Sequence, residues 1–156
     1  MVSGSLGIAI AFYSSSFKVL LRRPAIQPTR VLIVDDEFLI RWSLCQFLAS
    51  EGYEVTTAED GAEALEIART ECFDYVITDL SMPRLDGWGL LDNLMRFDLP
   101  PRVIVITGQD EDDNRRKVEE KGGWAYIEKS YLISDIKSAL ETRVMTTQSS
   151  GLEMSN

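Results

Sequence analysis

The chain has 156 residues, of which 45% are hydrophobic and 26% are charged, a composition typical of a globular protein with one domain and tails. Its formal net charge of −9 argues against direct nucleic-acid binding, because neutralising phosphates requires clustered lysine and arginine. The chain contains no histidine, which excludes a Ser-His-Asp triad, most catalytic zinc sites and a histidine phosphodonor of its own.

Residues 1–29 differ in composition from the rest of the chain. An apolar run, Leu6–Tyr13, precedes the basic residues Lys18, Arg22 and Arg23, and no acidic residue is present. The run is far shorter than the roughly 20 residues that cross a bilayer, and its positive charge follows the run, unlike a secretory signal. We therefore expect a poorly ordered extension over 1–29, with a membrane-surface segment as the less favoured alternative.

From residue 30 to residue 145, strand-like and helix-like segments alternate. Strands are predicted at 31–34, 53–58, 75–78, 103–106 and 125–128, and the first is continuously apolar, as in a parallel sheet covered on both faces. Amphipathic segments predict helices that begin near residues 40, 60, 88, 110 and 134. We expect this (βα)5 region to form one domain and the polar end, 146–156, to be disordered.

Two of the predicted helices have informative sequences. Asp60-Gly61-Ala62-Glu63 resembles a capping box, with Asp in place of Ser or Thr, and predicts a helix through about Arg69. The helix predicted at 110–121 has Val118 as its only strongly apolar residue. Because helices are stabilised mainly by packing an apolar face, we expect this one to be weakly held.

Side chains suited to phosphate chemistry follow the predicted strands. Asp35-Asp36-Glu37 comes after the first strand and Asp79 after the third, while Thr107 and Lys129 follow the fourth and fifth. The carboxyl ends of parallel strands line one crevice, and ligands of open α/β sheets bind there. The set is suited to holding a divalent cation and to receiving a phosphoryl group on an aspartate.

These segments resemble the receiver domain of bacterial two-component response regulators. The resemblance covers residues 30–145 and rests on four motifs in order, which are Val34–Glu37, Thr78–Pro83 with Asp86-Gly87, Thr107-Gly108 and Tyr126–Lys129. It implies an α/β, flavodoxin-like, doubly wound parallel sheet with the strand order 2-1-3-4-5.

The resemblance also implies roles for the site residues. Asp79 is the expected phosphoacceptor. Asp36, Asp79 and the backbone carbonyl of Ser81 are expected to bind Mg²⁺ directly, and Asp35 largely through a water molecule. The alternative is an acidic strand end that is merely solvated.

Three further residues complete the expected site. Lys129 and Thr107 are expected to contact the phosphoryl group, and Thr107 and Tyr126 to form a switch in which the ring moves inward. The alternatives are a surface lysine, an ordinary strand threonine and a rim tyrosine that never switches.

Other residues depart from the pattern or stand outside it. Ser130 occupies the position where the family usually has proline, which puts the reach of Lys129 in doubt. Trp124 is either packed locally or exposed as a contact for a partner. Cys45 and Cys72 are expected to be small buried side chains in a reducing compartment, although a disulfide is an alternative.

The sequence therefore predicts a stand-alone, cytoplasmic receiver that is not an enzyme. A histidine kinase or a histidine phosphotransfer protein would phosphorylate it, and a downstream protein would recognise the phosphorylated form. One alternative is a pseudo-receiver that docks partners without phosphate. Another is an aspartate-nucleophile phosphatase of the haloacid-dehalogenase type, which prefers Asp-x-Asp where this chain has Asp35-Asp36-Glu37.

Overall fold

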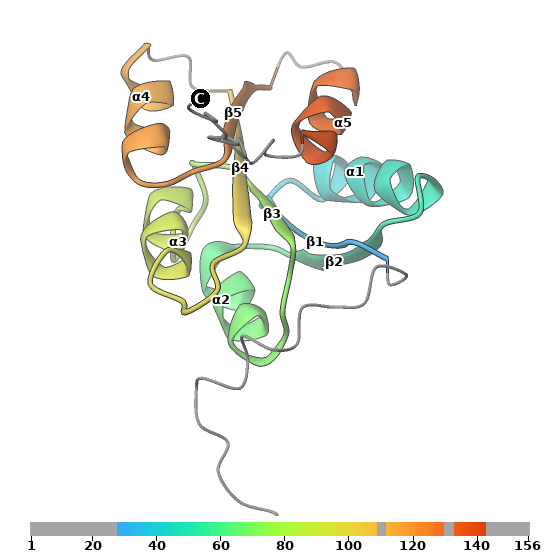
Figure 1. Ribbon diagram of the computed structural model, residues 1–156, viewed down its shortest axis with the longest axis horizontal. Coiled ribbons are helices and arrows are strands. Elements are labelled where there is room, and N and C mark those ends of the chain that lie inside the picture. The colour runs from blue at the N-terminus through green and yellow to red at the C-terminus, as the bar shows by residue number, and fades with distance from the viewer. Residues whose placement is uncertain (1–27, 109–111, 130–132, 143–156) are drawn as a thin grey trace, which may run out of the picture.

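Five parallel strands form the centre of the molecule (Figure 1). The computed structural model describes residues 28–108, 112–129 and 133–142. The strands are β1 (Arg30–Val34), β2 (Glu54–Ala58), β3 (Tyr75–Thr78), β4 (Arg102–Thr107) and β5 (Ala125–Glu128). They lie in the order β2-β1-β3-β4-β5, so the predicted flavodoxin-like sheet is confirmed.

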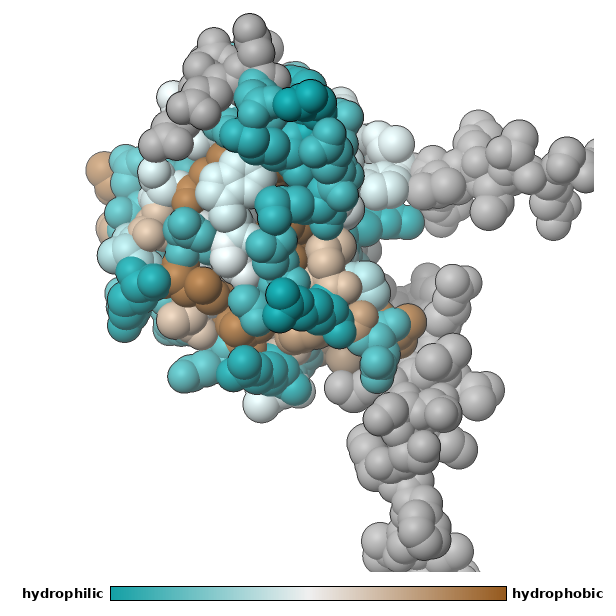
Figure 2. Space-filling model, turned by 90° about the vertical axis from the view of Figure 1, so that its left-hand side faces the viewer, coloured by the Kyte–Doolittle hydropathy of each residue, from teal (hydrophilic) through white to brown (hydrophobic). Residues whose placement is uncertain are grey.

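Within the described ranges, five helices cover the two faces of this sheet (Figure 1). They are α1 (Phe38–Ser50), α2 (Gly61–Thr70), α3 (Gly87–Leu94), α4 (Asp112–Glu120) and α5 (Ile133–Glu141). Helices α1 and α5 lie on one face, and α2, α3 and α4 lie on the other. The side of the molecule that carries α3 and α4 is largely hydrophilic at its surface (Figure 2).

Alternation along the strands produces two separate cores. In β1, Val31 and Ile33 pack with α1 and α5, whereas Leu32 and Val34 pack with the helices of the opposite face. All four are at most 1% exposed, which explains why the strand is apolar at each of these positions. The two cores hold the sheet rigidly and leave its carboxyl edge free for polar residues.

The helix ends follow from local chemistry. Asp60 caps α2 by accepting hydrogen bonds from the backbone amides of Ala62 and Glu63, as the capping box predicted. The Glu63 carboxylate accepts from the amide of Glu59, one residue before the cap. After α1, Gly52 adopts a φ of +88°, a left-handed conformation that glycine takes without steric cost.

Helix α4 buries little, as its sequence predicted. Val118 is fully buried, and the polar side chain of Asn114 is only 4% exposed. No sequence pattern indicated that Asn114 would be buried. Helix α3 ends at Leu94, several residues before the Pro100-Pro101 pair.

Two predictions about isolated side chains have different outcomes. Cys72 is exposed, so the expectation that both cysteines are buried is wrong. Cys45 is half-buried, and the two cysteines are not joined in a disulfide. Cys72 lies after the end of α2, in the loop before β3, where no apolar layer covers it. Trp124 is packed locally, since its indole Nε1 donates to the Ala139 carbonyl at 3.0 Å.

Some predictions fall on residues outside the described ranges. They concern the extension up to residue 27, the Ser130 position and the tail at 146–156. Within the described part of the chain, no helix is long and apolar enough to span a membrane.

Candidate functional site

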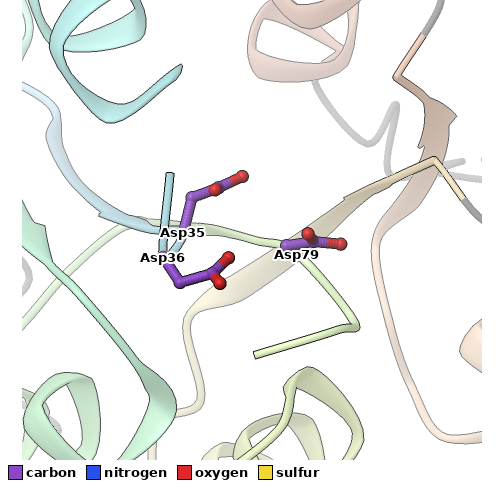
Figure 3. A group of neighbouring side chains, drawn as sticks. All are labelled: Asp35, Asp36 and Asp79. Carbon is purple, nitrogen blue, oxygen red and sulfur yellow. The ribbon is translucent and has the colours of Figure 1, made fainter. Parts of the chain in front are cut away.

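The site lies at the carboxyl edge of the sheet, where β1, β3 and β5 end. Asp35 and Asp36 follow β1, and Asp79 follows β3 (Figure 3). Parallel pairing of Val34 with Thr78 places the two acidic segments side by side. Lys129 follows β5, and its backbone amide donates to the Thr107 carbonyl at 2.8 Å, which continues the β4–β5 pairing into the site.

Three carboxylates lie close enough to share one cation. Asp35, Asp36 and Asp79 each offer an oxygen, and these oxygens all lie within 4.8 Å of one another. Asp35 and Asp79 are 4% and 6% exposed, whereas Asp36 is open to solvent. Hard oxygen ligands with one open side suit Mg²⁺, which retains several of its waters in proteins.

Burial and crowding make the negative charge of Asp35 costly. Burial raises the pKa of the Asp35 carboxyl above its ordinary value, and the charge of Asp79 acts in the same direction. The hydrogen bond from the Glu37 amide to Asp35 Oδ1, at 2.8 Å, and the Lys129 ammonium both oppose this rise in pKa. A divalent cation would favour the charged form further.

The two oxygens of Asp79 have different partners. Oδ1 accepts hydrogen bonds from the backbone amides of Leu80, at 2.6 Å, and Ser81, at 3.4 Å. Oδ2 faces the Lys129 ammonium at 2.9 Å. The backbone therefore fixes the orientation of the carboxylate, and Oδ2 is the oxygen beside the cationic side chain.

Lys129 contacts three carboxylates at once. Its Nζ lies 2.9 Å from Asp79 Oδ2, 2.8 Å from Glu37 Oε1 and 3.3 Å from Asp35 Oδ2. Burial alone would lower the pKa of Lys129, but hydrogen bonds to Glu37 and Asp79 and the charge of Asp35 raise it above its ordinary value. The ammonium therefore remains charged, as a phosphoryl contact requires.

Close backbone packing supports the phosphoacceptor position. The amide of Gly87 donates to the Leu80 carbonyl at 3.0 Å, and a Cβ atom at Gly87 would overlap with the backbone oxygen of Asp79. The Thr78 hydroxyl donates to that same oxygen at 2.9 Å. The Asp86-Gly87 pair is thus explained by two roles, since the Asp86 side chain caps α3 through the Gly89 amide.

The predicted switch residues are both buried. Thr107 is 1% exposed at the end of β4, and Tyr126 is 7% exposed on β5. The guanidinium of Arg115, from α4, lies over the Tyr126 ring at 5.2 Å from its centroid. The ring is therefore packed between the sheet and α4, and its role as a switch stays a prediction.

Sequence reasoning assigned no role to two residues that contribute to the site. Glu37 holds the Lys129 ammonium, and Arg41 Nη1 donates to the Asp35 carbonyl at 2.6 Å. Glu37 was visible in the sequence as a third acid beside the pair, but nothing in its spacing indicated contact with a residue 92 positions away. Arg41 lies one helical turn after Glu37, and no motif in the sequence indicated that it would contact the site.

Known proteins resemble this chain in sequence over the same region. The response regulator receiver domain family matches residues 31–141. The transcriptional regulatory protein PdtaR of Mycobacterium tuberculosis is 39% identical over 118 residues, covering 75% of this chain and 57% of that protein. The response regulator MprA of Mycolicibacterium vanbaalenii is 33% identical over 122 residues, covering 77% of this chain and 52% of that protein.

Solved structures also resemble the fold. A CheY-like receiver domain protein from Methanospirillum hungatei has a TM-score of 0.69 and 31% identity, covering 73% of this chain and 91% of that chain. A CheY from Borrelia burgdorferi has a TM-score of 0.69 and 33% identity, covering 72% of this chain and 87% of that chain. This chain spans about half the length of the curated relatives, so the stand-alone arrangement stays a prediction.

Proposed function

Because this chain belongs to the response regulator receiver domain family, we propose that it accepts a phosphoryl group on Asp79 in the presence of Mg²⁺. The observation that carries the proposal is the placement of Asp79, whose Oδ2 lies 2.9 Å from Lys129 Nζ and whose carboxylate has an oxygen within 4.8 Å of oxygens of Asp35 and Asp36. A carboxylate attacks phosphorus only when repulsion between the two anions is offset, and these neighbours supply the offset.

The three acidic side chains are the proposed magnesium ligands, together with the Ser81 carbonyl. When bound there, Mg²⁺ neutralises negative charge on the phosphoryl oxygens. Asp79 Oδ1 is held by backbone amides, which keeps the carboxylate aligned while Oδ2 forms the new bond to phosphorus. Lys129 and Thr107 then contact the phosphoryl oxygens, Lys129 as a cation and Thr107 through its hydroxyl.

The phosphoryl donor is another protein. The chain has no histidine, so the proposed donor is a phosphohistidine of a histidine kinase or phosphotransfer protein. The phosphorus–nitrogen bond of the donor breaks as the bond to Asp79 Oδ2 forms, and the donor imidazole leaves with the electron pair. The protein thus acts as a phosphoacceptor rather than as an enzyme with a separate substrate.

Two structural neighbours support this chemistry by what they contain. One is a Burkholderia pseudomallei response regulator with a phosphorylated aspartic acid and a calcium ion, at 27% identity and a TM-score of 0.68. The other is the Borrelia burgdorferi CheY, solved in a complex with CheX, BeF3 and Mg. Both are receiver-like chains that cover more than 70% of this one.

The proposed output is recognition of the phosphorylated form by a downstream protein. Tyr126 lies under Arg115 of α4, so a movement of Thr107 toward a phosphoryl group can be transmitted to that helix. Helix α4 buries few side chains, which suits a shift between two populated arrangements. A stand-alone arrangement and a cytoplasmic location remain predictions.

The test is intact-mass measurement of the full chain after incubation with acetyl phosphate and Mg²⁺. We expect one added phosphoryl group that is lost in alkali and absent from Asp79→Ala. A matched control is Asp98→Ala, which removes an exposed acid outside the site. If neither acetyl phosphate nor a kinase-containing lysate phosphorylates the protein, the pseudo-receiver interpretation replaces this one.

A further inference from the structure

We infer that Glu37 is a positioning residue that keeps the Lys129 ammonium at the mouth of the site when Mg²⁺ occupies the aspartates. The inference rests on the magnesium site of the proposed function and goes beyond it, because it assigns a role to a residue outside the ligand set. It starts from the contact of 2.8 Å between Glu37 Oε1 and Lys129 Nζ.

Lys129 and a magnesium ion would compete for two of the same carboxylates. The ammonium contacts Asp79 at 2.9 Å and Asp35 at 3.3 Å, and both residues belong to the cluster suited to the ion. Two cations cannot share these two carboxylates without strong repulsion. Lys129 must therefore weaken its hold on them when the ion enters.

Glu37 is the one of the three Lys129 partners that lies outside the ligand cluster. Its side chain is 60% exposed, whereas those of Asp35 and Asp79 are 5% and 6% exposed. Its carboxylate thus lies on the solvent side of the ammonium. A lysine that moves away from Asp79 and Asp35 still has this partner, which keeps it close enough to meet a phosphoryl group.

The position of Glu37 in the helix supports a role away from local structure. It is the N-cap residue of α1, a position that favours Ser, Thr, Asp or Asn because their short side chains accept from the helix amides. Glu37 makes no such hydrogen bond. Its longer side chain instead extends to a residue 92 positions away in the sequence.

A double-mutant cycle tests the inference. The affinity of each full-length protein for Mg²⁺ is measured by isothermal titration calorimetry with MgCl₂. The four proteins are the native protein, Glu37→Gln, Lys129→Met and the double variant. We expect Glu37→Gln to raise the Kd for Mg²⁺ about fivefold, the upper range for an exposed ion pair. In the Lys129→Met background the same change should raise the Kd less than about twofold.

The sign of the coupling distinguishes the proposed role from a simple field effect. If Glu37 only adds negative potential, removing it weakens Mg²⁺ binding at least as much when Lys129 is absent, because no cation then neutralises the carboxylate. An equal or larger effect in the Lys129→Met background therefore overturns the inference, as does a failure of Mg²⁺ to bind. Glu66→Gln, an exposed charge change on α2, is the matched control and should leave the Kd unchanged.

A second variant keeps the charge and shortens the side chain. Glu37→Asp should cap α1 and raise the melting temperature, yet weaken Mg²⁺ binding as Glu37→Gln does, because the carboxylate no longer reaches Lys129. Native affinity for Mg²⁺ in this variant would contradict the inference. Since none of these measurements involves phosphate, a failure of Asp79 to accept phosphate would overturn the proposed function and leave this test intact.

Discussion

The two edges of the sheet hold their charged side chains in opposite ways. At the amino edge, the Arg30 guanidinium meets Glu54 at 2.7 Å, meets Glu71 and donates to the Cys72 carbonyl at 2.9 Å. Among the described residues of the carboxyl edge, Asp35, Asp36 and Asp79 lie close together, and the Lys129 ammonium contacts Asp35, Glu37 and Asp79.

A second arginine at the amino edge is equally well satisfied. Arg102 donates to the Tyr75 hydroxyl at 2.7 Å and lies over the Trp124 ring at 4.5 Å from its centroid. Tyr75 in turn donates to the Leu140 carbonyl at 2.7 Å, which fastens the end of α5 to the sheet. Arg30 and Arg102 at this edge therefore each have complementary partners within the protein.

This contrast indicates which edge of the sheet is stabilised by its own charge pairs and at which edge a bound cation would add stability. A charge that is fully paired contributes to stability, whereas like charges held together by the scaffold reduce stability until a cation arrives. The ion pairs of the amino edge therefore support the fold, and the acidic cluster of the carboxyl edge fits the proposed Mg²⁺ site. Substitutions at the two edges test this contrast.

The largest effect is expected for Gly87→Ala at the carboxyl edge. The new methyl group would overlap with the Asp79 backbone oxygen. It would also lie 2.8 Å from the Leu80 Cα, closer than a Cβ atom can normally approach. We expect the free energy of unfolding to fall by about 3 kcal/mol, measured by urea denaturation, with weaker Mg²⁺ binding. Gly52→Ala, in a left-handed turn with open space around it, is the comparison: it should lose less stability and leave Mg²⁺ binding intact.

Tyr75→Phe tests the amino edge. Loss of the hydroxyl leaves the Leu140 carbonyl and one Arg102 donor without this partner, so the free energy of unfolding should fall by about 2 kcal/mol. Affinity for Mg²⁺, measured by titration calorimetry, should not change. A large loss of Mg²⁺ affinity would show that the two edges are coupled and would break the contrast.

The smallest effect, of opposite sign, is expected for Asp35→Asn without divalent cations. Burial raises the pKa of the Asp35 carboxyl in the folded protein, so the folded state disfavours the charged form. The protonated carboxyl at low pH therefore favours the folded state, and this contribution to the free energy of unfolding is lost as the pH rises through the folded pKa. At pH 7 in EDTA the variant should be more stable by about 1 kcal/mol. Below about pH 4 the gain should vanish because the native carboxyl is then protonated.

Added Mg²⁺ should reverse the order of stability, so that the native protein becomes more stable than Asp35→Asn. It should raise the melting temperature of the native protein and change that of Asp35→Asn little. Destabilisation by Asp35→Asn in EDTA would show that the contact between Lys129 and Asp35 outweighs the cost of burying the charge.

Local sequence accounts for much of the fold. The apolar run at Val31–Val34 indicated a strand covered on both faces, and the Asp60–Glu63 pattern indicated a helix start, because both signals depend on neighbouring residues. The prediction that Cys72 is buried is wrong because it, too, used only the local sequence. The apolar character of Cys72 suggested burial, but exposure depends on which layer lies above a loop, and no local pattern records that.

The succession of strands and helices along the chain, the resemblance to the receiver family, and the acidic and basic residues at the strand ends all followed from the sequence. Which of those side chains meet depends on the tertiary structure. Pairing of Val34 with Thr78 places Asp35 beside Asp79, and the end of β5 brings Lys129 to Glu37. Periodicity and capping act within a few residues, whereas contacts across 50 or 92 positions depend on how the sheet assembles.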